Sequence, residues 1–343
     1  MDSDSNIQHA GKLVKDFVSS DRKIRYSGKL EFPAPAADIG RVTLQKIALS
    51  LRLHQLPAGV MPVLVGMAYA FWKTGAFDFV PAVTILLLTA LTQLGGMCLD
   101  DYFDHHSGVD AKVTNRTLFS GGSDLIQTGV LKAQTMLLLG IATLGLALLL
   151  AFGLTAVKGN WVLVGIYVFG IFSGIFYTAP PFSAAYRGWG EILIAANYGP
   201  TAAELGYAAQ TGNFNISLLL VSLVFSGLIL AANLVHEMLD YEADRAVGKR
   251  GWVVLLGLEK SKKIFSALLI GPYALLILFV TFGMLPFAAL LPLGTAALGI
   301  GLVKRIGKAE EKEELFSILS KSFHLYVLFG LALTAGLVLD SCM

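Results

Sequence analysis

Nine long apolar runs constrain the fold of this chain more than any other feature. They lie near 55–73, 80–100, 133–154, 161–178, 189–209, 216–239, 264–282, 285–303 and 322–341. Each is long enough to cross a hydrocarbon core of about 30 Å as a helix that rises about 1.5 Å per residue. Charged residues make up only 15% of the chain, well below the ~25% of a typical soluble domain. We therefore predict an all-α polytopic membrane protein with about nine transmembrane helices.

Basic residues are distributed unevenly between the two ends of these runs. If successive runs alternate in direction, 24 of the 26 Lys and Arg residues fall on one side, and only Lys73 and Lys158 fall on the other. The positive-inside rule makes the basic side cytoplasmic. We therefore expect a multi-pass integral membrane protein whose N-terminus and basic loops are cytoplasmic, with the C-terminus on the opposite side.

The domain organisation follows from the same pattern. Residues 1–45 are polar and of mixed charge, without the apolar stretch of a signal peptide. No Pro/Gly/Ser-rich linker divides the apolar runs, so we expect a polar cytoplasmic segment over 1–45 and one membrane domain over 46–343. The two cysteines, Cys98 and Cys342, fall near opposite faces of the membrane, which argues against a disulfide.

Two acidic clusters lie at the basic ends of apolar runs. One is Asp100, Asp101 and Asp104, and the other is Asp240 and Asp244. Aspartates three or four residues apart share one face of a helix, and carboxylates at a membrane edge are costly without a compensating cation. Oxygen ligands of this kind suit Mg²⁺, which proteins commonly hold with a few carboxylates and the phosphates of a substrate. The clusters predict a metal–diphosphate site at a membrane surface.

The loops after the two clusters carry cations suited to phosphate. Lys112 and Arg116 follow the first cluster, together with a Ser-Gly-Gly-Ser stretch over 120–123, and Arg245 and Lys249 follow the second. Arginine grips phosphate with two hydrogen bonds, and glycines let backbone amides approach an anion. Ordinary positive flanking of membrane helices is the alternative explanation. Four runs separate the clusters, which favours two similar halves facing one another across a central cavity.

Several motifs, in order, resemble the UbiA superfamily of intramembrane prenyltransferases over residues ~50–340. The matching stretches are 101–110, 115–123, 177–182, 186–191 and 240–250. The Ser-Gly-Gly-Ser stretch and Tyr-Arg-Gly over 186–188 look most like the branch that prenylates dihydroxynaphthoate in menaquinone synthesis. The resemblance implies helices around a central cavity that is open to lipid.

The resemblance also implies a reaction and a set of site residues. The reaction is the Mg²⁺-dependent transfer of a prenyl group from an isoprenoid diphosphate to a small aromatic or quinone-precursor acceptor. The implied partners are the prenyl diphosphate, a small lipophilic acceptor and membrane lipid, and no nucleic acid. The expected catalytic and metal-binding residues are Asp100, Asp101, Asp104, Asp240 and Asp244. The expected diphosphate contacts are Lys112, Arg116, Tyr177, Arg187 and Arg245, to which the loop charge adds Lys249.

The chain departs from the family pattern at three places. Asp100 stands where the family usually has Asn, His236–Leu239 replace an Asn-Asn-x-Arg stretch, and Ser183–Ala185 replace basic residues before Tyr-Arg-Gly. An acid also occurs inside an apolar run, at Glu204. These departures keep open a terpene cyclase on the same scaffold, which would ionise and cyclise a prenyl diphosphate without an acceptor.

Glu204 itself allows two interpretations. It is either an acid near the outer membrane face that is solvated or paired, or a catalytic carboxylate in the cavity that deprotonates an acceptor or stabilises a carbocation. A third class of function, a transporter or channel, fits the sequence less well. Transport sites usually lie near the membrane midplane, whereas the acidic clusters lie at helix ends on one side.

Overall fold

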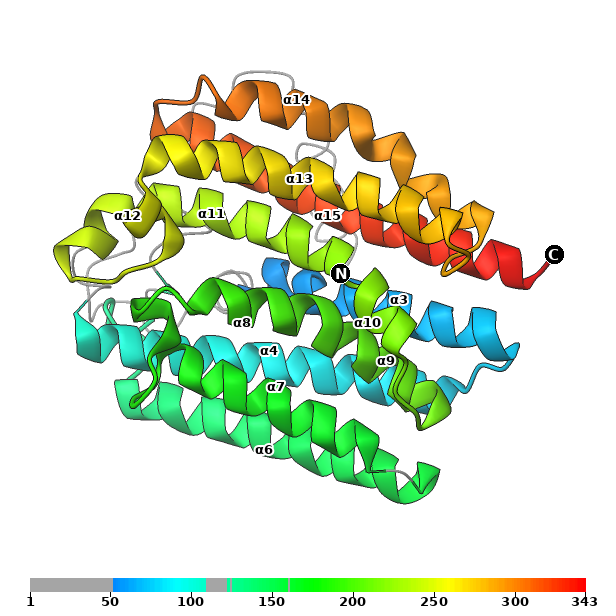
Figure 1. The fold of residues 1–343 in the computed structure, drawn as a ribbon. Helices are drawn as coiled ribbons and strands as arrows, with labels where there is room; N and C mark the ends of the chain where they lie inside the picture. The colour runs from blue at the N-terminus through cyan, green and yellow to red at the C-terminus, as the bar shows by residue number, and fades with distance from the viewer. Residues whose placement is uncertain (1–51, 109–121, 124, 160) are drawn as a thin grey trace, which may run out of the picture. The chain divides into compact units, whose positions relative to one another are not determined.

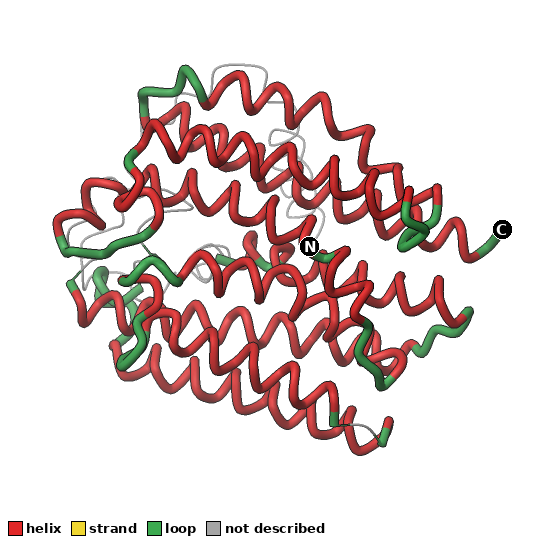
Figure 2. The backbone as a smooth tube through the Cα atoms, viewed as in Figure 1, coloured by secondary structure: helices red, strands yellow, loops and turns green. Residues whose placement is uncertain are grey.

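The computed structural model describes residues 52–108, 122–123, 125–159 and 161–343. These residues form helices and loops and contain no strand, which confirms the predicted all-α class (Figure 2). The α-helices are α3 (Pro57–Thr74), α4 (Phe79–Ser107), α6 (Ala133–Lys158), α7 (Val162–Thr178), α8 (Gly190–Ala196), α9 (Ala202–Thr211), α10 (Ile216–Val221), α11 (Leu223–Ala246), α12 (Trp252–Leu256), α13 (Leu258–Thr281), α14 (Ala296–Ile306) and α15 (Lys312–Ser341). Shorter helical segments are η2 (Leu53–Gln55), η3 (Ala184–Tyr186), η4 (Asn197–Thr201) and η5 (Phe287–Thr295).

Helical segments lie at every predicted apolar run. Within the described chain, seven of them are long and apolar enough to cross a membrane. The eighth, α7, is apolar but has only 17 residues. The ninth predicted run is divided into α8, η4 and α9. The multi-pass architecture is therefore confirmed. Seven of the nine expected spans are long enough to cross a membrane within the described chain, and the count of nine stays a prediction.

The divided run has a local cause. The segment η4 is a π-helical turn that contains Pro200. Proline has no backbone N–H and its ring clashes with the preceding turn, so a regular α-helix cannot continue through it. Breaks of this kind are tolerated in membrane helices where neighbouring helices satisfy the freed backbone groups. Ser226 serves in this way, since its hydroxyl donates at 2.7 Å to the Ala195 carbonyl, five residues before Pro200.

The buried side chains form two large apolar clusters. One is built from α3, α9, α11, α13, α14 and α15, and the other from α3, α4, α6, α7 and α9 (Figure 1). Helices α3 and α9 contribute to both clusters and cross closely. A Cβ at Gly66 would collide with the Ala203 carbonyl, and one at Gly206 would collide with the Val63 carbonyl. Close crossing of small residues is a common way to pack helices in membranes.

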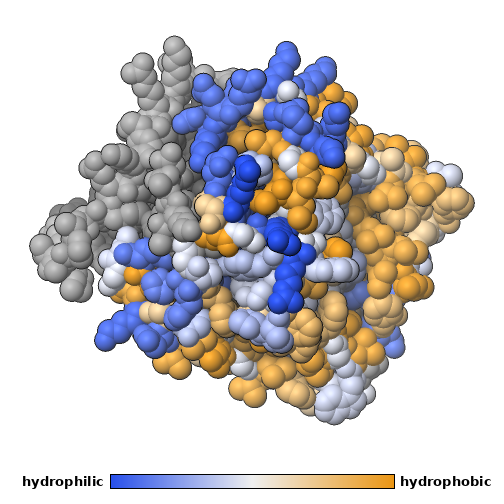
Figure 3. Space-filling view, turned by 60° about the vertical axis from the view of Figure 1, so that its left-hand side comes forward, coloured by the Kyte–Doolittle hydropathy of each residue, from blue (hydrophilic) through white to orange (hydrophobic). Residues whose placement is uncertain are grey.

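The carboxyl ends of α4, α7, α11 and α14 lie at one end of the bundle, which is on the left in Figure 1, and the C-terminus lies at the other. Viewed from that side, hydrophilic side chains gather over this end and apolar side chains cover the flank (Figure 3). Asp104 and Asp244 are near the ends of α4 and α11, so the fold brings the two acidic clusters to the same end.

Candidate functional site

Two adjoining cavities mark the site. The larger, here called the apolar cavity, has a volume of about 310 Å³ and is bounded by α3, α4, α7, α8, η4, α9, α11 and α15. The smaller, here called the polar cavity, has a volume of about 90 Å³ and lies at the end of the bundle that carries the acidic clusters. The residues that line both cavities are Arg52, Asp100, Tyr177, Asn233 and His236. An apolar space therefore adjoins a charged one.

Two aspartates of the first acidic cluster face the polar cavity and the third does not. Asp100 and Asp104, four residues apart on α4, both line the polar cavity. Asp104 accepts a hydrogen bond from the Tyr186 hydroxyl at 2.8 Å, and the same hydroxyl lies 2.8 Å from Ser107 Oγ. Asp101 is rotated by about 100° from Asp100 on the helix and does not line either cavity.

Asp101 is instead committed to a buried ion pair. Its Oδ1 lies 2.7 Å from Arg52 Nη2 and also accepts the Ser123 amide at 3.3 Å. Arg52 Nη2 donates to the Met97 carbonyl at 3.3 Å, and its Nη1 lies 4.0 Å from Asp100 Oδ2. A buried carboxylate needs such partners, because desolvation of an unpaired charge is costly. The predicted metal role of Asp101 stays a prediction, and its observed contact is with Arg52.

The second acidic cluster faces the polar cavity with both of its carboxylates. Asp240 Oδ2 lies 3.3 Å from His236 Nε2, one helical turn away on α11. Asp244 is only 3% exposed and its Oδ1 lies 3.6 Å from Lys249 Nζ. Asp240, Asp244 and Lys249 all line the polar cavity, so the structure brings together three of the residues that the sequence singled out.

Nearby acids raise the pKa values of two groups outside the membrane-spanning helices, Lys249 and Tyr186. Burial by itself lowers the pKa of Lys249, but Asp244, Asp104 and Asp100 more than offset this and raise the pKa well above its usual value. Burial and the nearby Asp104 raise the pKa of Tyr186 well above its usual value. Lys249 therefore stays cationic and Tyr186 stays a hydrogen-bond donor at neutral pH.

Charge in the polar cavity is dominated by carboxyl groups. The carboxyl-bearing residues that line it are Asp100, Asp104, Glu191, Glu237, Asp240 and Asp244. Among the described lining residues, the permanently charged cations are Arg52 and Lys249. Such an excess of acid attracts cations. Within the part of the chain that the structure describes, however, no three His, Cys, Asp or Glu side chains converge closely enough to form a metal-binding group.

The oxygen donors nevertheless fit Mg²⁺ in chemical type. Mg²⁺ is usually bound by one or two carboxylates and by substrate phosphates rather than by an all-protein cage. Two pairs of carboxylates around one small cavity, without a preformed cluster, are compatible with a metal that protein and phosphates hold jointly.

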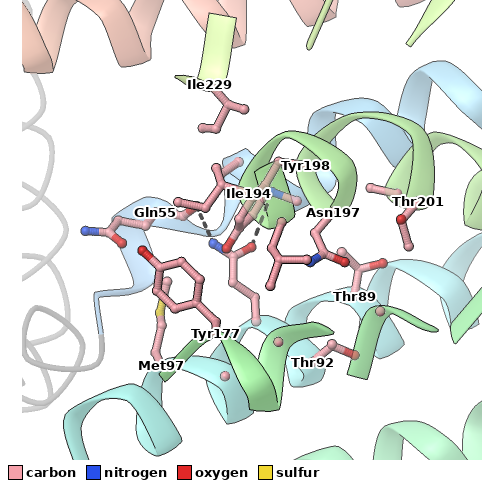
Figure 4. A pocket seen from close by; sticks show the side chains of 18 of the residues that line it. Gln55, Thr89, Thr92, Met97, Tyr177, Ile194, Asn197, Tyr198, Thr201 and Ile229 are labelled. Atoms are coloured by element: carbon pink, nitrogen blue, oxygen red, sulfur yellow. Dashed lines mark hydrogen bonds between the residues drawn. The ribbon is translucent and has the colours of Figure 1, made fainter. Parts of the chain in front are cut away.

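The apolar cavity combines apolar walls with a few polar side chains (Figure 4). Ile194 and Ile229 face it from α8 and α11, while Tyr177 lies toward one end and Thr201 toward the other. Asn197, on the π-helical turn, exchanges hydrogen bonds with Ser173 at 2.8–3.0 Å. The volume of the apolar cavity, about 310 Å³, is at the lower end of the range for small-molecule sites.

Several predicted residues lie elsewhere. Arg187 and Arg245 are exposed and line neither cavity, so their predicted diphosphate contacts stay predictions. Lys112 and Arg116 fall outside the described residues. Glu204 is 1% exposed and lines neither cavity.

Glu204 has a local contact instead. Its Oε2 accepts the backbone amide of Asn215 at 3.1 Å, in the turn between α9 and α10. This is the paired acid of the first interpretation, and its position does not support the predicted catalytic role in the cavity.

Sequence reasoning missed six polar or charged residues at the site. Five of them line the polar cavity, and the sixth, Tyr186, contacts Asp104; the five are Arg52, Glu191, Asn233, His236 and Glu237. Tyr186 had a signal, because it begins the Tyr-Arg-Gly motif in which Arg187 was chosen. Arg52 had none, since it lies 48 residues before Asp100 among other flanking basic residues.

Comparison with solved structures supports the fold. A UbiA homolog from Archaeoglobus fulgidus, solved bound to GPP and Mg²⁺, matches with a TM-score of 0.59 at 19% identity, covering 84% of this chain and 99% of that chain. A UbiA homolog from Aeropyrum pernix K1 matches with a TM-score of 0.57 at 16% identity, covering 88% and 99%.

Sequence comparison supplies the family. The UbiA prenyltransferase family matches residues 59–333. A 2-carboxy-1,4-naphthoquinone phytyltransferase from Synechocystis is 25% identical over 81% of this chain and 88% of the relative. A 1,4-dihydroxy-2-naphthoate octaprenyltransferase from Bacillus subtilis is 27% identical over 63% of this chain and 67% of the relative. The predicted resemblance is confirmed, and the chain belongs to the UbiA prenyltransferase family of membrane enzymes.

Proposed function

We propose that this enzyme transfers a prenyl group from an isoprenoid diphosphate to a small aromatic, quinone-precursor acceptor, and that it requires Mg²⁺. One observation carries this proposal more than any other. An apolar cavity of about 310 Å³ adjoins a polar cavity lined with carboxylates, and five residues belong to both. A prenyl diphosphate has the same division, with an apolar chain on one side and an anionic head on the other.

The side chains can be assigned to the two parts of the substrate. The apolar cavity takes the prenyl chain, and the polar cavity takes the diphosphate. Asp100 and Asp104 from α4, with Asp240 and Asp244 from α11, are the residues that would hold Mg²⁺ around the diphosphate. When bound, Mg²⁺ supplies charge stabilisation for the departing diphosphate.

The chain contributes the rest of the reaction environment. Lys249 remains protonated and supplies positive charge next to Asp244. The bond between the first prenyl carbon and the diphosphate oxygen breaks with its electron pair on the oxygen, which leaves an allylic cation. Apolar side chains such as Ile194 and Ile229 keep water away from that cation. A ring carbon of the acceptor then supplies the electron pair of the new carbon–carbon bond. The same carbon loses its proton to the released diphosphate, or its carboxyl group as CO2, which restores the aromatic ring.

The acceptor we propose is of the dihydroxynaphthoate type. Relatives from Synechocystis, Bacillus subtilis and Escherichia coli are named for prenylation of naphthoquinone or naphthoate acceptors. They favour transfer over the cyclisation that the departures at Asp100 and at 183–185 left open.

We also propose an orientation. The acidic clusters, α12 and the loop before α8 lie at the end of the bundle where 24 of the 26 basic residues are expected from the alternation of the runs. By the positive-inside rule this end is cytoplasmic, together with the N-terminus, and the C-terminus is on the opposite side.

Product analysis tests the proposal. Purified protein in lipid is incubated with Mg²⁺ and a panel of prenyl diphosphates of increasing length, with and without 1,4-dihydroxy-2-naphthoate. A prenylated naphthalene product that appears only with the acceptor is expected. A cyclic hydrocarbon or alcohol formed without the acceptor would establish the cyclase instead. If no diphosphate is released either with or without the acceptor, both prenyl transfer and cyclisation are excluded.

A further inference from the structure

Two carboxylates at the polar cavity belong to neither acidic cluster. Glu191 lies in the first turn of α8 and is 2% exposed, and Glu237 lies on α11, three residues before Asp240. Both line the polar cavity. A buried carboxylate that has no partner is strongly unfavourable, so the groups that satisfy these two acids indicate what the acids do.

Both acids accept hydrogen bonds from the start of α12. Glu191 Oε1 accepts the Trp252 amide at 2.5 Å, and Glu237 Oε2 accepts the Val253 amide at 3.1 Å. Glu237 Oε1 accepts a second hydrogen bond from Asn233 Nδ2 at 2.6 Å. The first amides of a helix have no partner within the helix, so these two carboxylates fix the start of α12. We call Glu191 and Glu237 the carboxylate clamp.

The clamp leaves no room for a side chain at Gly251. A Cβ at this position would lie 2.8 Å from Glu237 Oε2 and 3.2 Å from Glu191 Oε1. The backbone of Gly251 has φ −63° and ψ 167°, which other residues adopt easily. An alanine here would therefore displace the Glu237 carboxylate from its hydrogen bonds, so glycine is favoured by the close approach of the two carboxylates and not by its backbone conformation.

The clamped segment begins two residues after Lys249. On its other side, the Lys249 amide donates to the Asp244 carbonyl at 3.0 Å. Lys249 is thus held between the end of α11 and the start of α12, with its Nζ 3.6 Å from Asp244 Oδ1. Trp252 adds a further contact, since its indole N–H donates to the Gly188 carbonyl at 3.1 Å.

We propose that Glu191 and Glu237 are positioning residues that hold Gly251–Val253 in place, so that the Lys249 ammonium lies at the diphosphate site. This inference deepens the proposed function and rests on it. The position of Lys249 matters because Arg52 and Lys249 are the permanent cations among the described residues that line the polar cavity. Arg52, the other permanent cation among the described lining residues, is already engaged by Asp101.

The clamp can be tested without any turnover. Trypsin cleaves after Lys249 and Arg250, directly before the clamped segment. In the full-length protein in lipid, Glu191→Ala and Gly251→Ala should each increase cleavage at these two bonds by about tenfold or more, as measured by mass spectrometry of the fragments. Gly307→Ala is the matched control, because a Cβ there meets nothing within 4 Å. Unchanged cleavage in Gly251→Ala would overturn the clamp.

A conservative variant separates positioning from charge. Glu191 accepts the Trp252 amide through Oε1, and its carboxyl group also contacts that of Glu237. Glu191→Gln can keep the accepting oxygen, so it should retain most of the protection and most of the activity that Glu191→Ala loses. If Glu191→Gln is as defective as Glu191→Ala, and excess Mg²⁺ restores both, Glu191 acts as a metal ligand and the proposal is wrong.

A double-mutant cycle tests the link to Lys249. Gly251→Ala should raise KM for the prenyl diphosphate about tenfold with a smaller change in kcat. In a Lys249→Met background the same change should raise KM by less than about twofold, because the clamp acts through Lys249. Additive effects would overturn the link. If the unaltered protein transfers no prenyl group at all, the proposed function fails, while the tryptic cleavage still decides whether the clamp exists.

Discussion

The two acidic clusters have the same spacing but are supported in different ways. The α11 cluster is supported from nearby in sequence: His236 precedes Asp240 by one turn, and Lys249 follows Asp244 by five residues. The α4 cluster depends on distant residues, since Arg52 pairs with Asp101.

Tyr186 completes this distant support, because it comes from the segment before α8 and donates to Asp104. The geometry of the first cluster therefore depends on direct contacts with distant residues. The direct contacts of the second come from its own helix and the turn after it, and Glu191 reaches only the segment beyond that turn.

Removing a carboxylate charge from either cluster should have the largest effect on turnover. Asp104→Asn and Asp240→Asn each remove a charge that faces the polar cavity. We expect turnover to fall by at least about 100-fold in each, the scale of losing one electrostatic contact to a developing charge. Steady-state rates in lipid measure this. Near-normal activity in both variants would show that the paired clusters are not the diphosphate site.

Removal of the metal should abolish the activity that depends on both acidic clusters. EDTA is expected to abolish product formation, and added Mg²⁺ is expected to restore it, because the cavity carries more carboxyl groups than permanent cations among its described lining residues. The measurement is product formed before and after dialysis into Mg²⁺. Full activity that persists through chelation would contradict the metal requirement.

Loss of the Arg52–Asp101 ion pair that supports the α4 cluster should lower the stability of the protein. Arg52→Met leaves Asp101 buried without its cation, and breaking a buried pair typically costs about 3–5 kcal/mol. Thermal unfolding in detergent should show this loss. Arg52→Met with Asp101→Asn should recover part of it, because the uncompensated charge is gone. A double variant no more stable than Arg52→Met alone would show that Asp101 is not the source of the loss.

A smaller effect is expected from the other distant support. Tyr186→Phe removes the hydroxyl that donates to Asp104. One hydrogen bond contributes about 1 kcal/mol net, so we expect kcat/KM for the diphosphate to fall about fivefold with Mg²⁺ saturating. Tyr69→Phe is a control, because the Tyr69 hydroxyl donates to the Met284 carbonyl at 3.4 Å and Tyr69 lines neither cavity. Equal losses in the two variants would argue against a specific role of Tyr186.

The smallest effect should come from Glu204→Gln. The Gln side chain can still accept the Asn215 amide, and the position lies outside both cavities. We expect turnover and product identity within about twofold of the unaltered protein. A tenfold loss with an altered product would restore the catalytic interpretation of Glu204.

The same contrast explains what could be predicted from the sequence. Apolar runs set the helices and the end at which the acids gather, because a helix must match the thickness of the hydrocarbon core. The nearness of Lys249 to Asp244 could be expected from their separation of only five residues. The engagement of Asp101 by Arg52 could not, because helix periodicity says which residues share a face and nothing about which distant side chain meets that face.

Arg187 and Tyr186 show a second limit. They are adjacent in one motif, yet Tyr186 donates to Asp104 and Arg187 is exposed. The family resemblance favoured the arginine of this motif as a diphosphate contact. The local backbone decided otherwise, since η3 over Ala184–Tyr186 follows Ser183 in a left-handed conformation with φ 43°.

The π-helical turn at Asn197–Thr201 also sets the register of everything after it. A π-turn is equivalent to one inserted residue in an α-helix, and one residue rotates the following helix by about 100°. Gly206 must face the Val63 carbonyl, where no Cβ fits. If the same residues continued as a regular α-helix without this turn, Leu205 would take the place of Gly206 at that crossing. The π-turn therefore sets the rotation of α9 after Pro200, so that Gly206 faces α3 and the two helices pack without a steric clash.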